Sequence, residues 1–413
     1  MPLLRSKFVN IFLDYSFFIF YAPYIIASYL FNRAGYSFIP NALLILIYVT
    51  TIIRIIIRKQ KLLNTCTCFV LCLLPFVAIS SILSVTIPYK FLILLANMVC
   101  AYFACQNIDC NIKSFITFRA FFCSFTLLVM IFYYFLYNRN VFAIRELGRD
   151  GFFLNQDGFS SFGADVFICS ALLLKYAMFS KKQFYIRLVF FTFLLFSMSL
   201  GIATIFFTDR LGGLIRIIIF LILYFYYSFR KRKVFLLVIS LSIIIFLILF
   251  FSIDLSSLPS VNRIKILVVQ LFNTRKNYDS SIRIRVIMLL RDIRYAFSYP
   301  IFGPGYNKYL DINTDYGHNA FACVSNSFGL MSILLYLIII ILIIVQCKKQ
   351  NFIGKDIIIC YFLMSTLFSW VYGMAFSDRN YYFIFGSVIY ATFKNSSFEN
   401  KISKMIKIKW RKN

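Results

Sequence analysis

The stretch SSIRIRVIMLLRDIRYAFSYPIFGPGYNKYLDINTDYGHNAFACVSNSFGLMSILLYL, residues 280–337, joins three kinds of segment that together decide the fold. It begins with an arginine-rich segment whose apolar residues recur at helical spacing. It continues through the sequence Pro-Ile-Phe-Gly-Pro-Gly, residues 300–305, here named the glycine turn. It ends in a long apolar run, and His318, the only histidine, stands at the entrance to that run. The pattern predicts an amphipathic helix at a membrane surface, then a turn into a membrane-spanning helix.

The composition of the whole chain extends this prediction. Of 413 residues, 61% are hydrophobic and 20% aromatic, and the mean hydropathy is +0.83. Apolar runs of about 20 residues recur from end to end, which is the length that crosses a bilayer as a helix. These observations predict an all-α polytopic membrane protein that forms a single integral membrane domain over residues 1–413.

About twelve spans are predicted, together with a long outer loop before the tenth. The first apolar run holds Asp14 and lacks a small-residue cleavage site, so it is predicted to be a retained span rather than a signal peptide. The expected limits of the spans are 11–30, 42–57, 65–87, 91–108, 114–136, 164–179, 188–207, 214–229, 234–253, 319–345, 356–375 and 381–393.

The net charge of +28 indicates membrane orientation rather than nucleic-acid binding. With twelve spans, the clusters of lysine and arginine between spans all fall on one side, and that side is predicted to be the cytoplasm. Both termini are then cytoplasmic, and residues 394–413 form a basic cytoplasmic tail. The main clusters between spans lie at 58–61, 181–187, 230–233 and 348–355.

The outer loops carry the residues that point to chemistry. Two are long, 138–163 and 254–318, and both favour arginine, whereas the cytoplasmic tail favours lysine. A guanidinium grips phosphate through two parallel hydrogen bonds, so these arginines predict a phosphate or pyrophosphate site. The alternative is that they pair with lipid headgroups or with loop acids. The prediction includes Arg145, Arg149, Arg283 and Arg285 in these two loops, and Arg210 in the short, charged outer loop 208–213.

His318 is the candidate general base, because an imidazole titrates near neutral pH. The alternative is an interfacial polar residue at the mouth of a span. No metal or other cofactor is predicted, since the outer loops lack the several oxygen ligands that a hard divalent cation needs. Cys66, Cys68 and Cys72 are interpreted as small packing residues rather than metal ligands.

Four segments resemble, in order and spacing, the motifs of the O-antigen polymerase and O-antigen ligase superfamily of bacterial envelope glycan assembly. The matching segments are residues 149–155, residues 208–213, Arg285 with the glycine turn, and His318-Asn319 with 328–330. This chain departs from the family pattern at Asp209, where serine is usual, and at Ser327, near the usual acid.

The resemblance implies a metal-independent glycosyltransferase at the periplasmic face of the bacterial inner membrane, active in lipopolysaccharide biosynthesis. Its substrates would be repeat units linked to undecaprenyl pyrophosphate. The further partners implied are membrane lipids, a flippase and a chain-length regulator, with no nucleic acid. His318, Arg210 and Arg285 would be catalytic, and the residues expected to bind substrate are Arg149, Arg283, Arg145, Asn319 and Asn155.

Three functions stay open. The polymerase is favoured by the Phe- and Ile-rich composition, and its product could be O-antigen, capsule or exopolysaccharide. A ligase would move the finished glycan to lipid A core or to protein. A flippase or other transporter would place charged residues within its spans. The predicted spans hold few charged residues, mainly Asp14, Arg54, Arg119 and Lys175.

Overall fold

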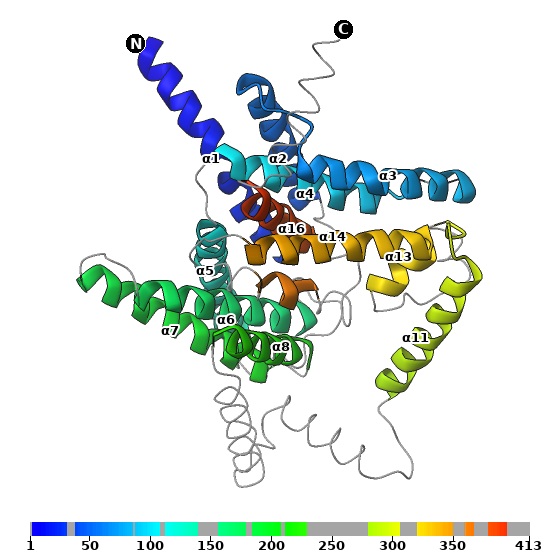
Figure 1. The fold of residues 1–413 in the computed structure, drawn as a ribbon. Helices are drawn as coiled ribbons and strands as arrows, with labels where there is room; N and C mark the ends of the chain where they lie inside the picture. The colour runs from blue at the N-terminus through cyan, green and yellow to red at the C-terminus, as the bar shows by residue number, and fades with distance from the viewer. Residues whose placement is uncertain are drawn as a thin grey trace. The chain divides into compact units, whose positions relative to one another are not determined.

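The computed structural model describes residues 2–30, 38–85, 87–107, 112–138, 156–178, 184–207, 211–228, 280–305, 320–349, 359, 361–366 and 379–394. All regular structure in these ranges is helical, which confirms the all-α class (Figure 1). The predicted span 234–253 and most of the span 356–375 lie outside the described residues, as does most of the two long loops.

Twelve helices are described. Their bounds are α1 (Pro2–Leu30), α2 (Phe38–Ile57), α3 (Thr65–Ser84), α4 (Tyr89–Asn107), α5 (Ile112–Asn138), α6 (Gln156–Met178), α7 (Phe184–Phe207), α8 (Leu211–Ser228), α11 (Ser280–Ser298), α13 (Ala320–Phe328), α14 (Leu330–Lys349) and α16 (Arg379–Phe393).

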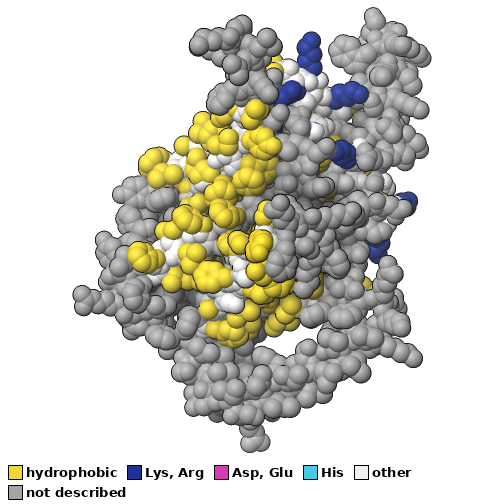
Figure 2. Space-filling view, turned by 90° about the vertical axis from the view of Figure 1, so that its left-hand side faces the viewer, with side chains coloured by type: hydrophobic (Ala, Val, Ile, Leu, Met, Phe, Trp, Pro, Cys, Tyr) yellow, Lys and Arg dark blue, Asp and Glu magenta, His cyan; other side chains and the backbone are white. Residues whose placement is uncertain are grey.

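Four described segments are long and apolar enough to cross a bilayer: Phe38–Ile57, Thr65–Ser84, Leu188–Phe206 and Leu330–Lys349. Large apolar side chains such as Ile52, Ile56 and Val189 are exposed on them. Figure 2 shows hydrophobic side chains gathered over one face, with lysines and arginines towards its edge. Because such a surface would be costly in water, the protein is a helical membrane protein.

The chain divides into two compact units, each described by itself. The first comprises Met1–Phe17, Ile47–Ile112 and Asp279–Asn413, and the second comprises Phe18–Leu46 and Lys113–Tyr278. In the first unit, α16 packs along α4, and α3 contacts α4, α13, α14 and α16. In the second unit, α6 packs against both α7 and α8.

Within each unit, two helices cross at a glycine, where no side chain of that glycine separates the two backbones. A Cβ added at Gly386 in α16 would run into the backbone of Met98 in α4. In the second unit, a Cβ at Gly163 of α6 would lie 2.9 Å from the Gly201 carbonyl oxygen of α7. Small residues at such crossings let apolar helices gain close packing in lipid, where hydrophobic burial offers little.

The predicted span 319–345 is wrong as a single helix, because the chain breaks into α13 and α14 at Gly329. Gly329 has φ +92°, and a Cβ there would run into the backbone of Ile301 and Phe302 in the glycine turn. The turn therefore occupies the space that a side chain at residue 329 would need. Only glycine both adopts this positive φ without strain and leaves that space free.

Two other boundaries bear on the site. The predicted amphipathic helix is confirmed as α11, which ends before Tyr299-Pro300. Helix α6 begins at Gln156, whereas the sequence placed residues up to 163 in a loop. Helix α6 therefore begins about two turns closer to the N-terminus than predicted.

We expect Gly386→Ala to lower the free energy of unfolding by about 1–3 kcal/mol, because a methyl group would force α16 away from α4. Thermal unfolding of the purified protein in detergent measures this loss. Ser387→Ala is the matched control, since the Ser387 hydroxyl donates to the Ile384 carbonyl of its own helix. An equal effect of both substitutions would contradict the close-packing account.

Candidate functional site

Most of the predicted site residues lie outside the described residues. This applies to Arg145, Arg149, Asn155, Arg210, His318 and Asn319. Arg283 and Arg285 lie in α11, as the helical spacing predicted. The described residues that adjoin the predicted site residues in the sequence show which of the four motif segments lead into helices that contact one another within each unit.

In the first unit, the glycine turn docks on the junction between α13 and α14. The backbone N–H of Met331 donates to the Pro300 carbonyl at 3.2 Å. A Cβ at Gly303 would lie 2.6 Å from the Ser327 carbonyl oxygen, and the rings of Phe302 and Phe76 lie 5.9 Å apart. The turn is thus held between α3 and the end of α13.

This docking joins two of the motif segments. Helix α11, which carries Arg283 and Arg285, leads directly into the glycine turn and contacts α13. Helix α13 begins at Ala320, directly after His318-Asn319 in the sequence. The arginine helix and the helix that follows the histidine therefore belong to one packed assembly.

In the second unit, the other two segments lead into neighbouring helices. The N–H of Gly213 in α8 donates to the Ser160 hydroxyl of α6 at 3.1 Å. Gly213 follows Arg210 by three residues, and Ser160 follows Asn155 by five. The N-terminal parts of α6 and α8 therefore lie side by side, since the contact joins the fifth residue of α6 to the third residue of α8.

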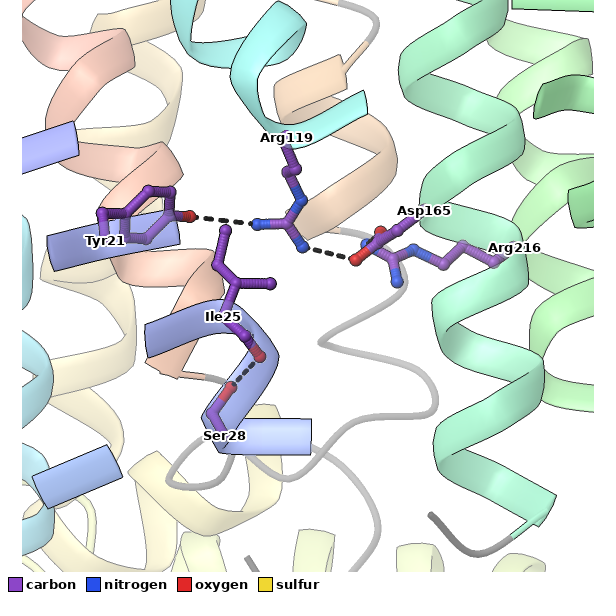
Figure 3. A network of polar contacts seen from close by, with 6 residues as sticks. All are labelled: Tyr21, Ile25, Ser28, Arg119, Asp165 and Arg216. Carbon is purple, nitrogen blue, oxygen red and sulfur yellow. Dashed lines mark hydrogen bonds and ion pairs between the residues drawn. The ribbon is translucent and has the colours of Figure 1, made fainter. Parts of the chain in front are cut away.

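The second unit also contains a buried charged network that the sequence interpretation did not assemble (Figure 3). Arg119 of α5 donates through Nη2 to Asp165 of α6, and Arg216 Nη2 of α8 lies 2.5 Å from the other carboxylate oxygen. Arg119 also donates to the Tyr21 hydroxyl of α1 at 3.2 Å. The exposed fractions of Arg119, Asp165 and Arg216 are 2%, 0% and 5%.

The network holds helices from distant parts of the sequence together. A carboxylate between two guanidiniums replaces the water that each charge loses on burial, although such pairing rarely adds net stability. Arginine keeps its charge at all accessible pH values, so this network is not suited to relay protons. It suits the joining of α5, α6 and α8, or the recognition of an anion.

This network was not predicted from the sequence, because the predicted start of α6 lies too late in the chain. Asp165 is the second residue of the predicted span 164–179, where a charge can reach the membrane surface. Because α6 begins at Gln156, Asp165 instead lies nine residues inside the helix. A search for charges within all spans, applied to Asp165 and Arg216 as well as Arg119, would have found the three residues but not their contacts.

An open cavity of about 810 Å³ lies in the second unit among α5, α6 and α7, and its lining includes exposed side chains such as Tyr185 and Val189. Its volume is in the range that binds a small ligand, about 300–1,000 Å³. Phe118 and Ala120, which flank Arg119 in the sequence, both line it. The walls are largely aromatic and suit an apolar chain, and they include Phe118, Phe121, Phe122, Tyr185, Phe190 and Phe193.

Helix α11 buries an acid and partly buries a tyrosine in the first unit. Asp292 is 1% exposed, and Arg291 Nη2 lies 3.4 Å from its Oδ1. Burial raises the pKa of the Tyr295 hydroxyl, and neighbouring Tyr299 raises it further, so Tyr295 is uncharged at neutral pH. Among the described side chains, no group of three His, Cys, Asp or Glu residues could hold a metal ion.

Neither the models of known protein families nor the curated proteins include a match to this chain.

We expect Asp165→Asn to lower the free energy of unfolding by about 3–5 kcal/mol, because two buried guanidiniums would lose their counter-charge. The measurement is thermal unfolding in detergent, with abundance in the membrane as a second readout. Replacing the three residues together, with Arg119→Met, Asp165→Leu and Arg216→Met, should recover most of the loss. Wild-type stability of Asp165→Asn would show that the carboxylate is not needed as a counter-charge.

Proposed function

We propose that this protein is a glycosyltransferase that polymerises O-antigen or a related surface polysaccharide at the periplasmic face of the inner membrane. It would move a growing glycan from undecaprenyl pyrophosphate to another lipid-linked repeat unit. The observation that carries the proposal is the docked glycine turn, which links the arginine helix α11 to the helix that directly follows His318.

The proposed reaction needs two functions from the protein. The bond between the anomeric carbon of the donor and the pyrophosphate oxygen breaks, and the electron pair leaves with that oxygen. Arg210 and Arg285 would stabilise this charge, with Arg145, Arg149 and Arg283 binding the diphosphate. His318 would take the proton of the acceptor hydroxyl as the new glycosidic bond forms, and Asn155 and Asn319 would orient the substrates.

Two further features of the second unit agree with a lipid diphosphate as the ligand. Helices α6 and α8, whose N-terminal parts adjoin at Ser160 and Gly213, directly follow the Arg149 and Arg210 segments, and helix N-termini favour anions. The cavity of about 810 Å³ offers an apolar, aromatic surface of the kind that a polyprenyl chain would contact.

A ligase uses the same donor, so the arginines and the histidine do not separate it from a polymerase. Glycan length in a strain that lacks the gene distinguishes them. Single repeat units on the lipid A core indicate a lost polymerase, whereas uncapped core with accumulated polymer indicates a lost ligase.

A transporter of lipid-linked sugars is the second candidate, and the buried network of Arg119, Asp165 and Arg216 favours it. Charged residues deep within membrane helices are costly and often belong to a substrate pathway. Vesicles that contain the purified protein and a labelled lipid-linked sugar provide the test. Movement of the sugar across the membrane without new glycosidic bonds would replace the polymerase proposal.

The direct test of the polymerase uses purified protein with defined lipid-linked oligosaccharides, with and without a chelator. We expect His318→Ala and Arg285→Ala to reduce chain growth by about 10²-fold or more, because each would remove a proton acceptor or a charge stabiliser. Membrane abundance should stay at the wild-type level. Normal polymer from either variant would remove that residue from the site.

Arg210→Ala should be as severe as Arg285→Ala, and Arg210→Lys should restore only part of the activity. Lysine keeps the positive charge but lacks the planar fork that binds two phosphate oxygens. Lys394→Ala is the control for the loss of one positive charge, since Lys394 lies after α16 with its ammonium 5.6 Å from the Tyr390 ring centroid. Full rescue by lysine would show that charge alone suffices.

A further inference from the structure

Helix α13 contains a buried amide that the fold leaves unsatisfied. Asn326 is fully buried, yet no described residue offers a hydrogen-bond partner to its Oδ1 or its Nδ2. The adjacent Ser327 is also fully buried, and its hydroxyl likewise has no partner among the described residues. Burying polar groups without partners costs free energy, and the cost is largest in an apolar surrounding.

The backbone around these two residues, in contrast, is well satisfied. The Ser80 hydroxyl of α3 donates to the Ser327 carbonyl at 2.9 Å, and the Gly329 N–H donates to the Ser325 carbonyl at 2.7 Å. The helix is therefore held firmly, and the two unsatisfied side chains are not the result of loose packing.

The opposite side of α13 is apolar. Val324 and Phe328, four residues apart, line a small pocket with Leu73, Val77 and Phe91. Asn326 lies two residues from each, so it projects from the other side of the helix. The Asn326 side chain is thus separated from the apolar packing that anchors α13 on α3 and α4, whereas Ser327, three residues after Val324, lies beside that packing.

We propose that Asn326 and Ser327 form a sugar-binding subsite, in which they bind hydroxyl groups of the acceptor repeat unit. An amide offers two donors and one acceptor, and a hydroxyl group can both donate and accept. An anion would satisfy Nδ2 but repel Oδ1, and a cation would do the reverse. A neutral ligand rich in hydroxyl groups suits both atoms and the Ser327 hydroxyl as well.

This inference rests on the proposed function for its choice of the acceptor. Helix α13 directly follows His318, the proposed base that takes the proton of the acceptor hydroxyl. Residues eight and nine positions further along would then bind the same sugar chain. Both side chains are 0% exposed, so a sugar would reach them only after the segments that cover them moved apart.

The test compares Asn326→Leu with wild-type protein in detergent. Leucine matches asparagine in size and removes the unsatisfied amide, so we expect the melting temperature to rise by a few degrees. The KM for the lipid-linked acceptor should rise about tenfold or more, with a smaller change in kcat, because ligand hydrogen bonds are lost. Ser327→Ala should also raise the melting temperature and the KM, each by a smaller amount.

Ser365→Ala is the matched control, since Ser365 is a buried serine of the same unit whose hydroxyl has no partner among the described residues. It should keep the wild-type KM. An unchanged KM in folded Asn326→Leu would overturn the proposal. So would a lower melting temperature, because it would show that the amide is satisfied by a structural water and serves the fold.

A second measurement separates this inference from the proposed polymerase. The free repeat-unit oligosaccharide should raise the melting temperature of the wild-type protein and not that of Asn326→Leu. If the wild-type protein transfers no sugar but shows this rise, the polymerase fails and the sugar subsite stands. If it transfers sugar and both proteins respond equally, the subsite fails and the polymerase stands.

Discussion

The hydrocarbon interior of a membrane offers no hydrogen-bond partners, and this constraint shapes the described structure. Backbone polar groups are satisfied within helices, which is why all regular structure in the described residues is helical. Several hydroxyl side chains follow the same rule. Ser81, Thr126 and Thr204 each donate to the carbonyl four residues earlier in their own helix, at 2.7–2.8 Å. Polar residues can thus occupy apolar helices without a partner from elsewhere.

Groups that cannot be satisfied within one helix are more informative. Arg119, Asp165 and Arg216 pair with one another across three helices, and this pairing offsets part of the cost of their burial. The side chains of Asn326 and Ser327 have no such compensation among the described residues. Residues that break a structural rule without compensation are expected at functional sites, where the cost in stability is offset by binding.

Close backbone contacts complete the arrangement around the candidate site. The glycine turn meets α13 and α14 through Gly303 and Gly329, where any side chain would separate the segments. Glycines likewise allow close backbone contact between α4 and α16, and between α6 and α7. In each case packing is gained by removing atoms rather than by adding apolar surface, as helices in lipid require.

The sequence by itself determined the helical membrane class, helix α11 and the turn after it, because hydropathy, helical periodicity and proline act over a few neighbouring residues. Only the tertiary structure decided where the tenth predicted span breaks, since Gly329 adopts φ +92° against the docked glycine turn. It alone paired Arg119 with Asp165, which lie 46 residues apart. Contacts between distant helices depend on how whole helices pack, and no local pattern records that packing.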